Sequence, residues 1–178
     1  CPRATSSTTR GRPFKTHTLT AMLALDPRMV NDAVYQKTFG INDFYLTDGS
    51  GGPPLGNVQL LGKVSGAILK SDLKWMPERA LQALSRRTVD FLIMTEDLPE
   101  PTSRVRLDGD KIVLDWRRSN MTAHHGLKRR MKSCLKEAGF PIVLTHLFDR
   151  KTPSHQCGTI RIGSDGAATT SPPKASAD

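Results

Sequence analysis

The stretch SHQCGTIRIG, residues 154–163, holds the residue types in this chain that are best suited to chemistry. Histidine as a residue type titrates near neutral pH, so the imidazole of His155 is suited to take a proton from an alcohol. Gly158 lets the backbone approach a ligand closely, and Thr159 and Arg161 offer hydrogen-bond donors to an anion or a polar ring. Taken alone, these residues favour a hydrogen-bonded turn histidine and leave the edge of a reactive site as the alternative.

Other candidate motifs give weaker signals. The chain has no GxGxxG after a strand, no GxxxxGK[ST] loop and no GxSxG elbow. His124 and His125 are adjacent, so on a helix they point to different sides; we predict polar surface in a first turn, with a pocket lining as the alternative. The acidic run of Glu96, Asp97 and Glu100 does not by its adjacency place two carboxylates on one substrate.

The three cysteines form no CxxC pair, and Cys157 with His155 is too sparse a set for a zinc site. We therefore predict no metal site, and free thiols in a reducing compartment, with a disulfide framework as the alternative. The localisation is left open, with the cytoplasm slightly favoured. No run of about 18 apolar residues occurs, so we expect no membrane span.

A net charge of +9 over 178 residues raises the question of nucleic-acid binding. Much of the charge lies in GLKRRMKSCLKEAGF, where helical spacing puts apolar and basic residues on opposite sides. Leu127, Met131, Leu135 and Ala138 share one face, and Arg129, Lys132 and Lys136 lie opposite. The chain lacks aromatic RNP motifs, RGG repeats and zinc-finger spacing. A solvated basic face is thus favoured, and a non-enzymatic domain that binds nucleic acid or an acidic partner remains the alternative.

The length of 178 residues suits one domain, and the apolar pattern predicts strands and helices in mixed order. Strands are expected at 16–25, 41–46, 88–97 and 141–148, with a hairpin over 104–116 around Asp108-Gly109. Helices are expected from Asp26-Pro27, within 58–76 despite Gly62 and Gly66, over 77–87, and over 121–138 between Asn120 and Gly139. This order predicts an α+β fold, with an antiparallel or mixed sheet and helices packed on one face.

Three stretches together resemble one enzyme family. HQCGTIRIG resembles the His-x-x-Gly-Thr-x-Arg-Met-Gly stretch of the glucose–methanol–choline (GMC) flavin oxidoreductases, in the branch that includes pyranose oxidase. EDLPEPTSRVRLD (96–108) is similar to that family's acidic, proline-bearing run into a strand. GRPFKTH (11–17) is similar to the stretch where its FAD domain passes into its substrate domain. The three occur in the family's order over residues 11–163.

The resemblance implies a function and a set of site residues. It implies an FAD-dependent oxidation of an alcohol or sugar hydroxyl, in which the histidine matching His155 takes the hydroxyl proton as hydride passes to the flavin. It also implies that the backbone of Gly158 and Thr159 approaches FAD. The substrate itself and the electron acceptor are not implied by these motifs.

The resemblance also implies a domain plan. We expect a flexible tail over 1–10, a junction from the FAD domain over 11–25, a substrate-binding domain over 26–150, a returning FAD-domain segment over 151–163 and a disordered tail over 164–178. The family's dinucleotide-binding fingerprint has no counterpart here, and the residues after Asp165 match no family segment. We therefore expect a truncated or frame-shifted product that neither retains FAD nor turns over substrate alone.

Overall fold

The computed structural model describes residues 13–34, 37–149 and 154–159, which contain three helices and eight strands. The fold class is α+β, as the sequence predicts. The expected tails at 1–10 and 164–178 lie outside the described residues. The chain forms two compact units, a sheet unit of 18–34, 37–95 and 120–149 and a small unit of 13–17, 96–119 and 154–159.

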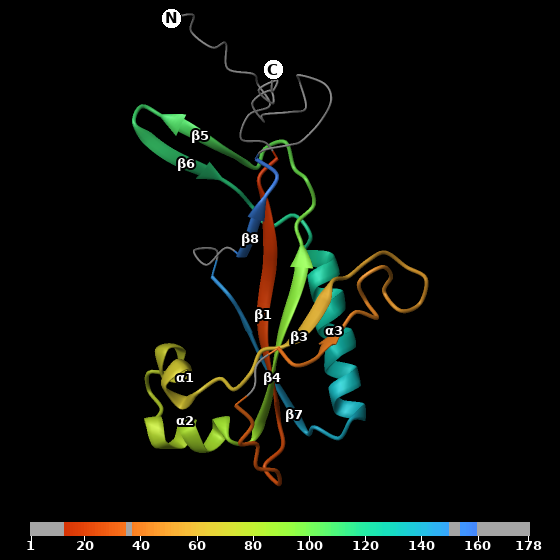
Figure 1. Ribbon diagram of the computed structural model, residues 1–178, viewed down its shortest axis with the longest axis vertical. Coiled ribbons are helices and arrows are strands. Elements are labelled where there is room, and N and C mark those ends of the chain that lie inside the picture. Colours follow the sequence, from red (N-terminus) through yellow and green to blue (C-terminus); the bar gives the residue numbers. More distant parts are fainter. Residues whose placement is uncertain (1–12, 35–36, 150–153, 160–178) are drawn as a thin grey trace, which may run out of the picture. The chain divides into compact units, whose positions relative to one another are not determined.

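The sheet unit is built on antiparallel strands in the order β2-β3-β4-β1-β7, with β1 between β4 and β7 (Figure 1). The strands are β1 (Lys15–Leu25), β2 (Gly40–Ile41), β3 (Asn57–Leu60), β4 (Thr88–Glu96) and β7 (Ile142–Leu147). The predicted strands at 16–25, 88–97 and 141–148 are thus confirmed. Their β-branched and apolar runs suit a sheet whose central strand is buried on both faces.

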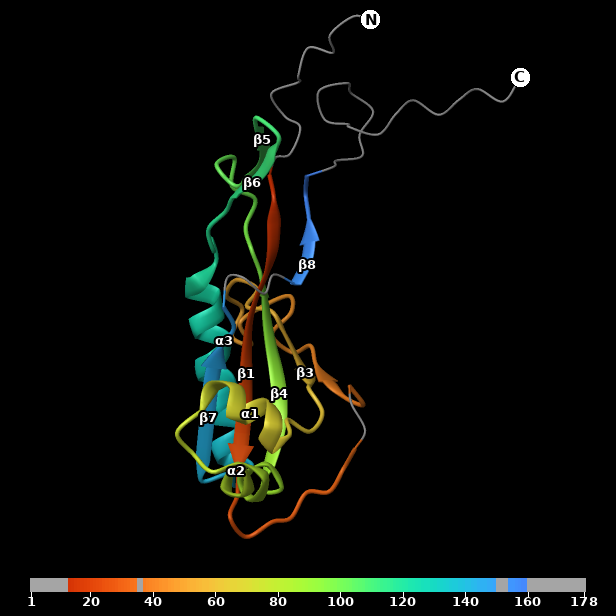
Figure 2. The same ribbon diagram turned by 90° about the vertical axis from the view of Figure 1, so that its left-hand side faces the viewer.

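Helix α3 (Met121–Glu137) lies along one face of this sheet, in Figure 1 and in the view turned by 90° in Figure 2. Apolar residues spaced four apart bury its inner face and meet the strands in one core: Met22, Ala24, Leu55, Val58, Phe91, Ile93, Ala123, Leu127, Met131 and Leu135. The predicted amphipathic pattern is therefore confirmed up to Leu135, whereas Ala138 is exposed.

The C-terminus of α3 ends as the sequence predicts. Gly139 has φ +94°, and its N–H donates to the Lys136 carbonyl while the Phe140 N–H donates to the Leu135 carbonyl. This pair of bonds is a Schellman motif, which needs a residue that tolerates the left-handed region. At the other end, Asn120 occupies the N-cap position but its side chain makes no capping hydrogen bond.

Two short helices, α1 (Gly66–Asp72) and α2 (Glu78–Ser85), pack against each other in the same unit. A Cβ at Gly66 would lie 2.6 Å from the Gln82 backbone nitrogen, so glycine at this position permits the close packing of α1 on α2. The same glycine lowers the helix propensity of α1. Asp72 of α1 reaches His146 of β7, and Leu81 of α2 is fully buried. The 77–87 prediction is confirmed as α2.

The small unit contains the β5–β6 hairpin and strand β8. Strands β5 (Arg104–Asp108) and β6 (Lys111–Asp115) pair in register around Gly109, whose φ is +60°. This confirms the predicted hairpin. Strand β8 (Ser154–Cys157) pairs antiparallel with the start of β1.

Three local predictions are wrong. Residues 26–34 form a loop and not a helix, because the Asp26 carboxylate accepts the Arg28 N–H and the Asn31 N–H donates to Arg86. The strand expected at 41–46 ends at Ile41, since Tyr45 bonds back to Asn42 in a turn. In the second loop, the Phe44 carbonyl also accepts from the Leu55 and Gly56 N–H groups. In both loops, therefore, other hydrogen bonds replace those of the expected helix or strand.

The helical spacing within 58–76 is also misleading in its first part. Residues 57–60 form β3, which pairs with β4, and only 66–72 are helical. Residues 61–64 do not continue a helix because Asp90 binds their backbone: its carbonyl accepts the Leu61 N–H, and its carboxylate accepts the Val64 N–H. None of the described helices is long and apolar enough to cross a membrane.

Candidate functional site

The small unit brings together the three stretches GRPFKTH, EDLPEPTSRVRLD and SHQCGTIRIG. Their described parts are 13–17, 96–108 and 154–159. The first contacts both others: the Phe14 N–H donates to the Ser103 carbonyl, and the Thr16 hydroxyl bonds to the Ser154 backbone. Segments separated by about eighty and again by about fifty positions in the sequence therefore meet in one small structure.

His155 lies in an irregular part of the β1–β8 ladder. Lys15 pairs with Cys157 and His17 pairs with Ser154, so β8 carries one residue more than the facing length of β1. His155 falls in this bulge with φ +54°, a left-handed conformation that is uncommon for a residue other than glycine. Bulges of this kind re-aim side chains, and they recur next to active sites.

The bulge places the His155 ring against His17. Their Nδ1 atoms lie 2.8 Å apart, and the rings meet edge to face with centroids 4.8 Å apart. His155 is exposed and His17 is half-buried. Burial is the main cause that lowers the pKa of His17, and the neighbouring His155 lowers it further. His17 is thus held neutral over more of the pH range than a free histidine.

Asp97 joins the acidic stretch to the rest of the small unit. Only 2% of the residue is exposed, and its carboxylate accepts from the indole N–H of Trp116 at 2.9 Å and from the backbone N–H of Ser119. The Thr16 N–H lies 3.4 Å from the same carboxylate, and the Asp97 N–H donates to the Thr16 carbonyl. Asp97 therefore fixes the strand residue immediately before His17.

Lys15 and Glu96 form an ion pair beside the histidines. The hydrogen bond to Glu96 is the main cause that raises the pKa of Lys15. Because the Glu96 side chain is largely exposed, this pair is a surface contact of small energetic weight. Its two charges oppose each other near His17, where Glu96 and Asp97 raise the pKa and Lys15 lowers it.

Gly158 has a role within this chain that accounts for the glycine. Its φ is +87°, and a Cβ here would lie 2.0 Å from the Pro13 carbonyl oxygen. The close backbone approach that glycine permits is therefore made to Pro13. Thr159 is half-buried. Contact of Gly158 and Thr159 with FAD stays a prediction.

The prediction for His124 is wrong, whereas His125 is exposed as expected. Only 1% of His124 is exposed; its Nε2 lies 2.7 Å from the Thr20 hydroxyl and its Nδ1 3.1 Å from the Thr95 hydroxyl. The two sheet hydroxyls satisfy both ring nitrogens, which allows a polar side chain to lie on the inner face of α3. His124 is thus a structural residue between helix and sheet.

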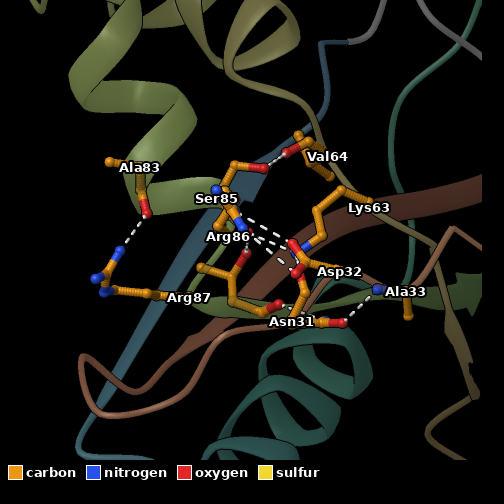
Figure 3. Close-up of polar contacts among 10 residues, drawn as sticks. Asn31, Asp32, Ala33, Lys63, Val64, Ala83, Ser85, Arg86 and Arg87 are labelled. Atoms are coloured by element: carbon orange, nitrogen blue, oxygen red, sulfur yellow. Dashed lines mark hydrogen bonds and ion pairs between the residues drawn. The ribbon is translucent and has the colours of Figure 1, made fainter.

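A second polar cluster in the sheet unit joins the loop after β1, the segment between β3 and α1, and the end of α2 (Figure 3). The Lys63 ammonium donates to the Asn31 carbonyl and to the Ser85 carbonyl, and the Ser85 hydroxyl donates to the Val64 carbonyl. Because Ser85 is the last residue of α2, Lys63 places a cation at a helix C-terminus. The cluster ties three segments together, and nothing in the spacing of these residues in the sequence indicates it.

Cys134 and Cys157 are free and exposed, as predicted for thiols, and Cys1 lies outside the described residues. In the described part of the chain, no three His, Cys, Asp or Glu side chains gather in a group that could hold a metal ion. His17 and Asp97 were not predicted as site residues from the sequence. Both lie inside the stretches that carry the family resemblance, which was the available signal.

No protein-family model and no curated protein matches this chain.

Proposed function

We propose that this chain carries the proton-accepting part of an FAD-dependent oxidoreductase of the GMC type, which oxidises an alcohol or sugar hydroxyl with His155 as the base. One observation carries the proposal: the three stretches that resemble the family meet in the small unit, around the His17–His155 pair. A chance resemblance of three separate stretches gives no reason for them to meet.

The local geometry supports proton acceptance by His155. Its ring is exposed, and its one hydrogen bond to a described residue uses Nδ1. Within the described part of the chain, Nε2 makes no hydrogen bond and is open to a substrate hydroxyl. The O–H bond breaks as its proton bonds to the Nε2 lone pair, and the electron pair of that bond forms the carbonyl.

FAD would supply the acceptor for the hydride that leaves the carbinol carbon. The described residues fit the proton-accepting half of this reaction. The family's glycine-rich dinucleotide-binding fingerprint has no counterpart in the sequence, and the Gly158 backbone is approached closely by Pro13. We accordingly expect the pyrophosphate-binding part of the site to come from chain other than residues 13–159.

The decisive experiment uses the longest open reading frame that contains this sequence. Its product is purified, and bound flavin is measured by visible absorbance together with oxidation of a panel of alcohols and sugars. His155→Ala is expected to lower kcat by about 10²–10⁴-fold, the usual contribution of a general base. His125→Ala is the matched control, since that side chain is exposed on α3, and should leave kcat unchanged.

A product that binds no flavin would refute the proposal. So would a flavin-loaded His155→Ala variant that turns over at the full rate. For the 178-residue chain alone, we expect no stoichiometric flavin after purification. Stoichiometric flavin there would refute the expectation that the cofactor site lies elsewhere, while leaving the role of His155 to the kinetic test.

The alternative, a basic binding domain, has weaker support. Arg129, Arg130 and Lys136 are exposed on the outer side of α3, as a solvated face requires. A salt-dependent mobility shift with generic DNA would favour this alternative, and the absence of a shift at low salt would exclude nucleic acid as the partner.

A further inference from the structure

The contact between His17 and His155 joins the same atom, Nδ1, of both rings at 2.8 Å. Such a contact needs a proton on one nitrogen and a lone pair on the other. A neutral imidazole carries one ring proton, so the ring that donates through Nδ1 has a lone pair on Nε2. The accepting ring carries its proton on Nε2. In the neutral pair, therefore, only one of the two rings can accept a further proton at Nε2.

We infer that His17 is a positioning residue that accepts the Nδ1–H of His155 and so holds His155 in the tautomer whose Nε2 can take a proton. This inference rests on the proposed function and names the device by which that site would be poised. His17 would touch neither substrate nor flavin and would act only through His155.

The direction of the hydrogen bond follows from the protonated state of the base. Once His155 has accepted a proton, its imidazolium has a proton on both nitrogens and no lone pair. It can then only donate to His17. The same donation from His155 serves before and after proton transfer, so neither ring has to rotate. With the opposite direction, His155 would carry its proton on Nε2 and could not act as a base.

His17 suits the acceptor role because it stays neutral. Burial, and next the adjacent His155, lower the pKa of His17, which favours the neutral ring that an acceptor needs. The other groups facing His17 are Lys15 on its own strand and Glu96 and Asp97 at the end of β4, and their effects on its pKa are opposed.

The backbone holds both rings in place. Thr16 bonds to the Ser154 backbone on one side and to Asp97 on the other, which anchors the residues before His17 and His155. The bulge and the positive φ then turn His155 toward His17. Backbone strain of this kind persists where surrounding structure enforces it, and it clusters at functional sites.

The test reads the tautomers directly and needs no flavin. Two-bond ¹H–¹⁵N correlation spectra of the ¹⁵N-labelled full chain, above the pKa of both rings, should show His155 protonated mainly on Nδ1 and His17 on Nε2. In His17→Phe the acceptor is lost, and His155 should shift toward the Nε2–H form. In His17→Asn the amide oxygen can accept instead, and the Nδ1–H form should return in part. His125→Phe should leave the His155 spectrum unchanged.

A wild-type His155 protonated mainly on Nε2 would overturn the inference, and so would a His155 tautomer that His17→Phe does not alter. In the flavin-loaded enzyme, His17→Phe should lower kcat by about 100-fold, with partial rescue in His17→Asn, by analogy with the loss of a tautomer-fixing partner. Expected spectra without any alcohol oxidation would uphold the tautomer arrangement and refute the proposed function.

Discussion

His124 and His155 use the same side chain in opposite surroundings. His124 lies between α3 and the sheet with both ring nitrogens bonded to threonine hydroxyls. His155 lies on a bulged strand, exposed, with only Nδ1 bonded to a described residue. A ring that is satisfied on both sides stabilises the fold, whereas a ring with one open nitrogen can exchange a proton. Whether the second ring nitrogen is hydrogen-bonded therefore distinguishes the structural histidine, His124, from the candidate base, His155.

The largest effect expected from this comparison is on folding stability at His124. His124→Leu keeps the volume roughly constant but leaves the buried hydroxyls of Thr20 and Thr95 without their ring partner. We expect the free energy of unfolding to fall by about 2–4 kcal/mol, measured by urea denaturation with circular dichroism.

His125→Leu is the control, because that ring is exposed on the same helix one residue away. Its effect should stay within about 0.5 kcal/mol. Equal losses in the two variants would mean that the hydroxyl contacts of His124 contribute nothing and that the contrast with His155 is one of exposure alone.

The next effect tests whether the small unit has a buried polar centre of its own. Asp97→Ala removes the acceptor of the Trp116 indole and of the Ser119 N–H, which should destabilise the unit by about 1–3 kcal/mol. Trp116 fluorescence in a Trp75→Phe background reports unfolding of this unit, since Trp75 is 78% exposed. Asp110→Ala, at the exposed hairpin tip, is the control and should behave as wild type.

The sequence predicted those elements whose apolar spacing is strong. β1, β4, β7, the β5–β6 hairpin, α2 and α3 all follow from periodicity and from turn residues such as Gly139. It failed at 26–34 and 41–46, where hydrogen bonds to distant or side-chain atoms decide the backbone. No local pattern contains such partners, so propensity alone could not find these loops.

The candidate site shows the same limit. His155 could be selected from its motif, but its partner His17 is 138 positions away in the sequence. Their contact depends on a one-residue bulge in β8, and no residue pattern in SHQC predicts a bulge. Likewise, the spacing of His124 three residues before Leu127 places it on the buried face of α3, but its bonds to Thr20 and Thr95 have no signal in the sequence.

A smaller, pH-dependent effect is expected at Asp90, which is buried like His124 but has an Oδ1 atom without a partner among the described residues. Burial raises the pKa of Asp90 above its usual value of 3.8. A raised folded-state pKa gives stability that is fully present below the unfolded value and is lost as pH rises through the folded value. Wild type should therefore lose stability relative to Asp90→Asn as pH rises from 3.8 toward neutrality. A stability difference that does not vary with pH would contradict this.

The smallest effect on the free energy of unfolding is expected at His155. Its sign tells whether the backbone at this position is strained. Because the ring is exposed, His155→Ala should change stability by less than about 0.5 kcal/mol. His155→Gly should stabilise the small unit by about 0.5–1 kcal/mol relative to His155→Ala, because glycine adopts a φ of +54° without strain. Trp116 fluorescence in the Trp75→Phe background measures both. If glycine gives no gain, the backbone at 155 is not strained. If it does, histidine is kept at a position that costs stability, which distinguishes it from His124, whose removal costs stability instead.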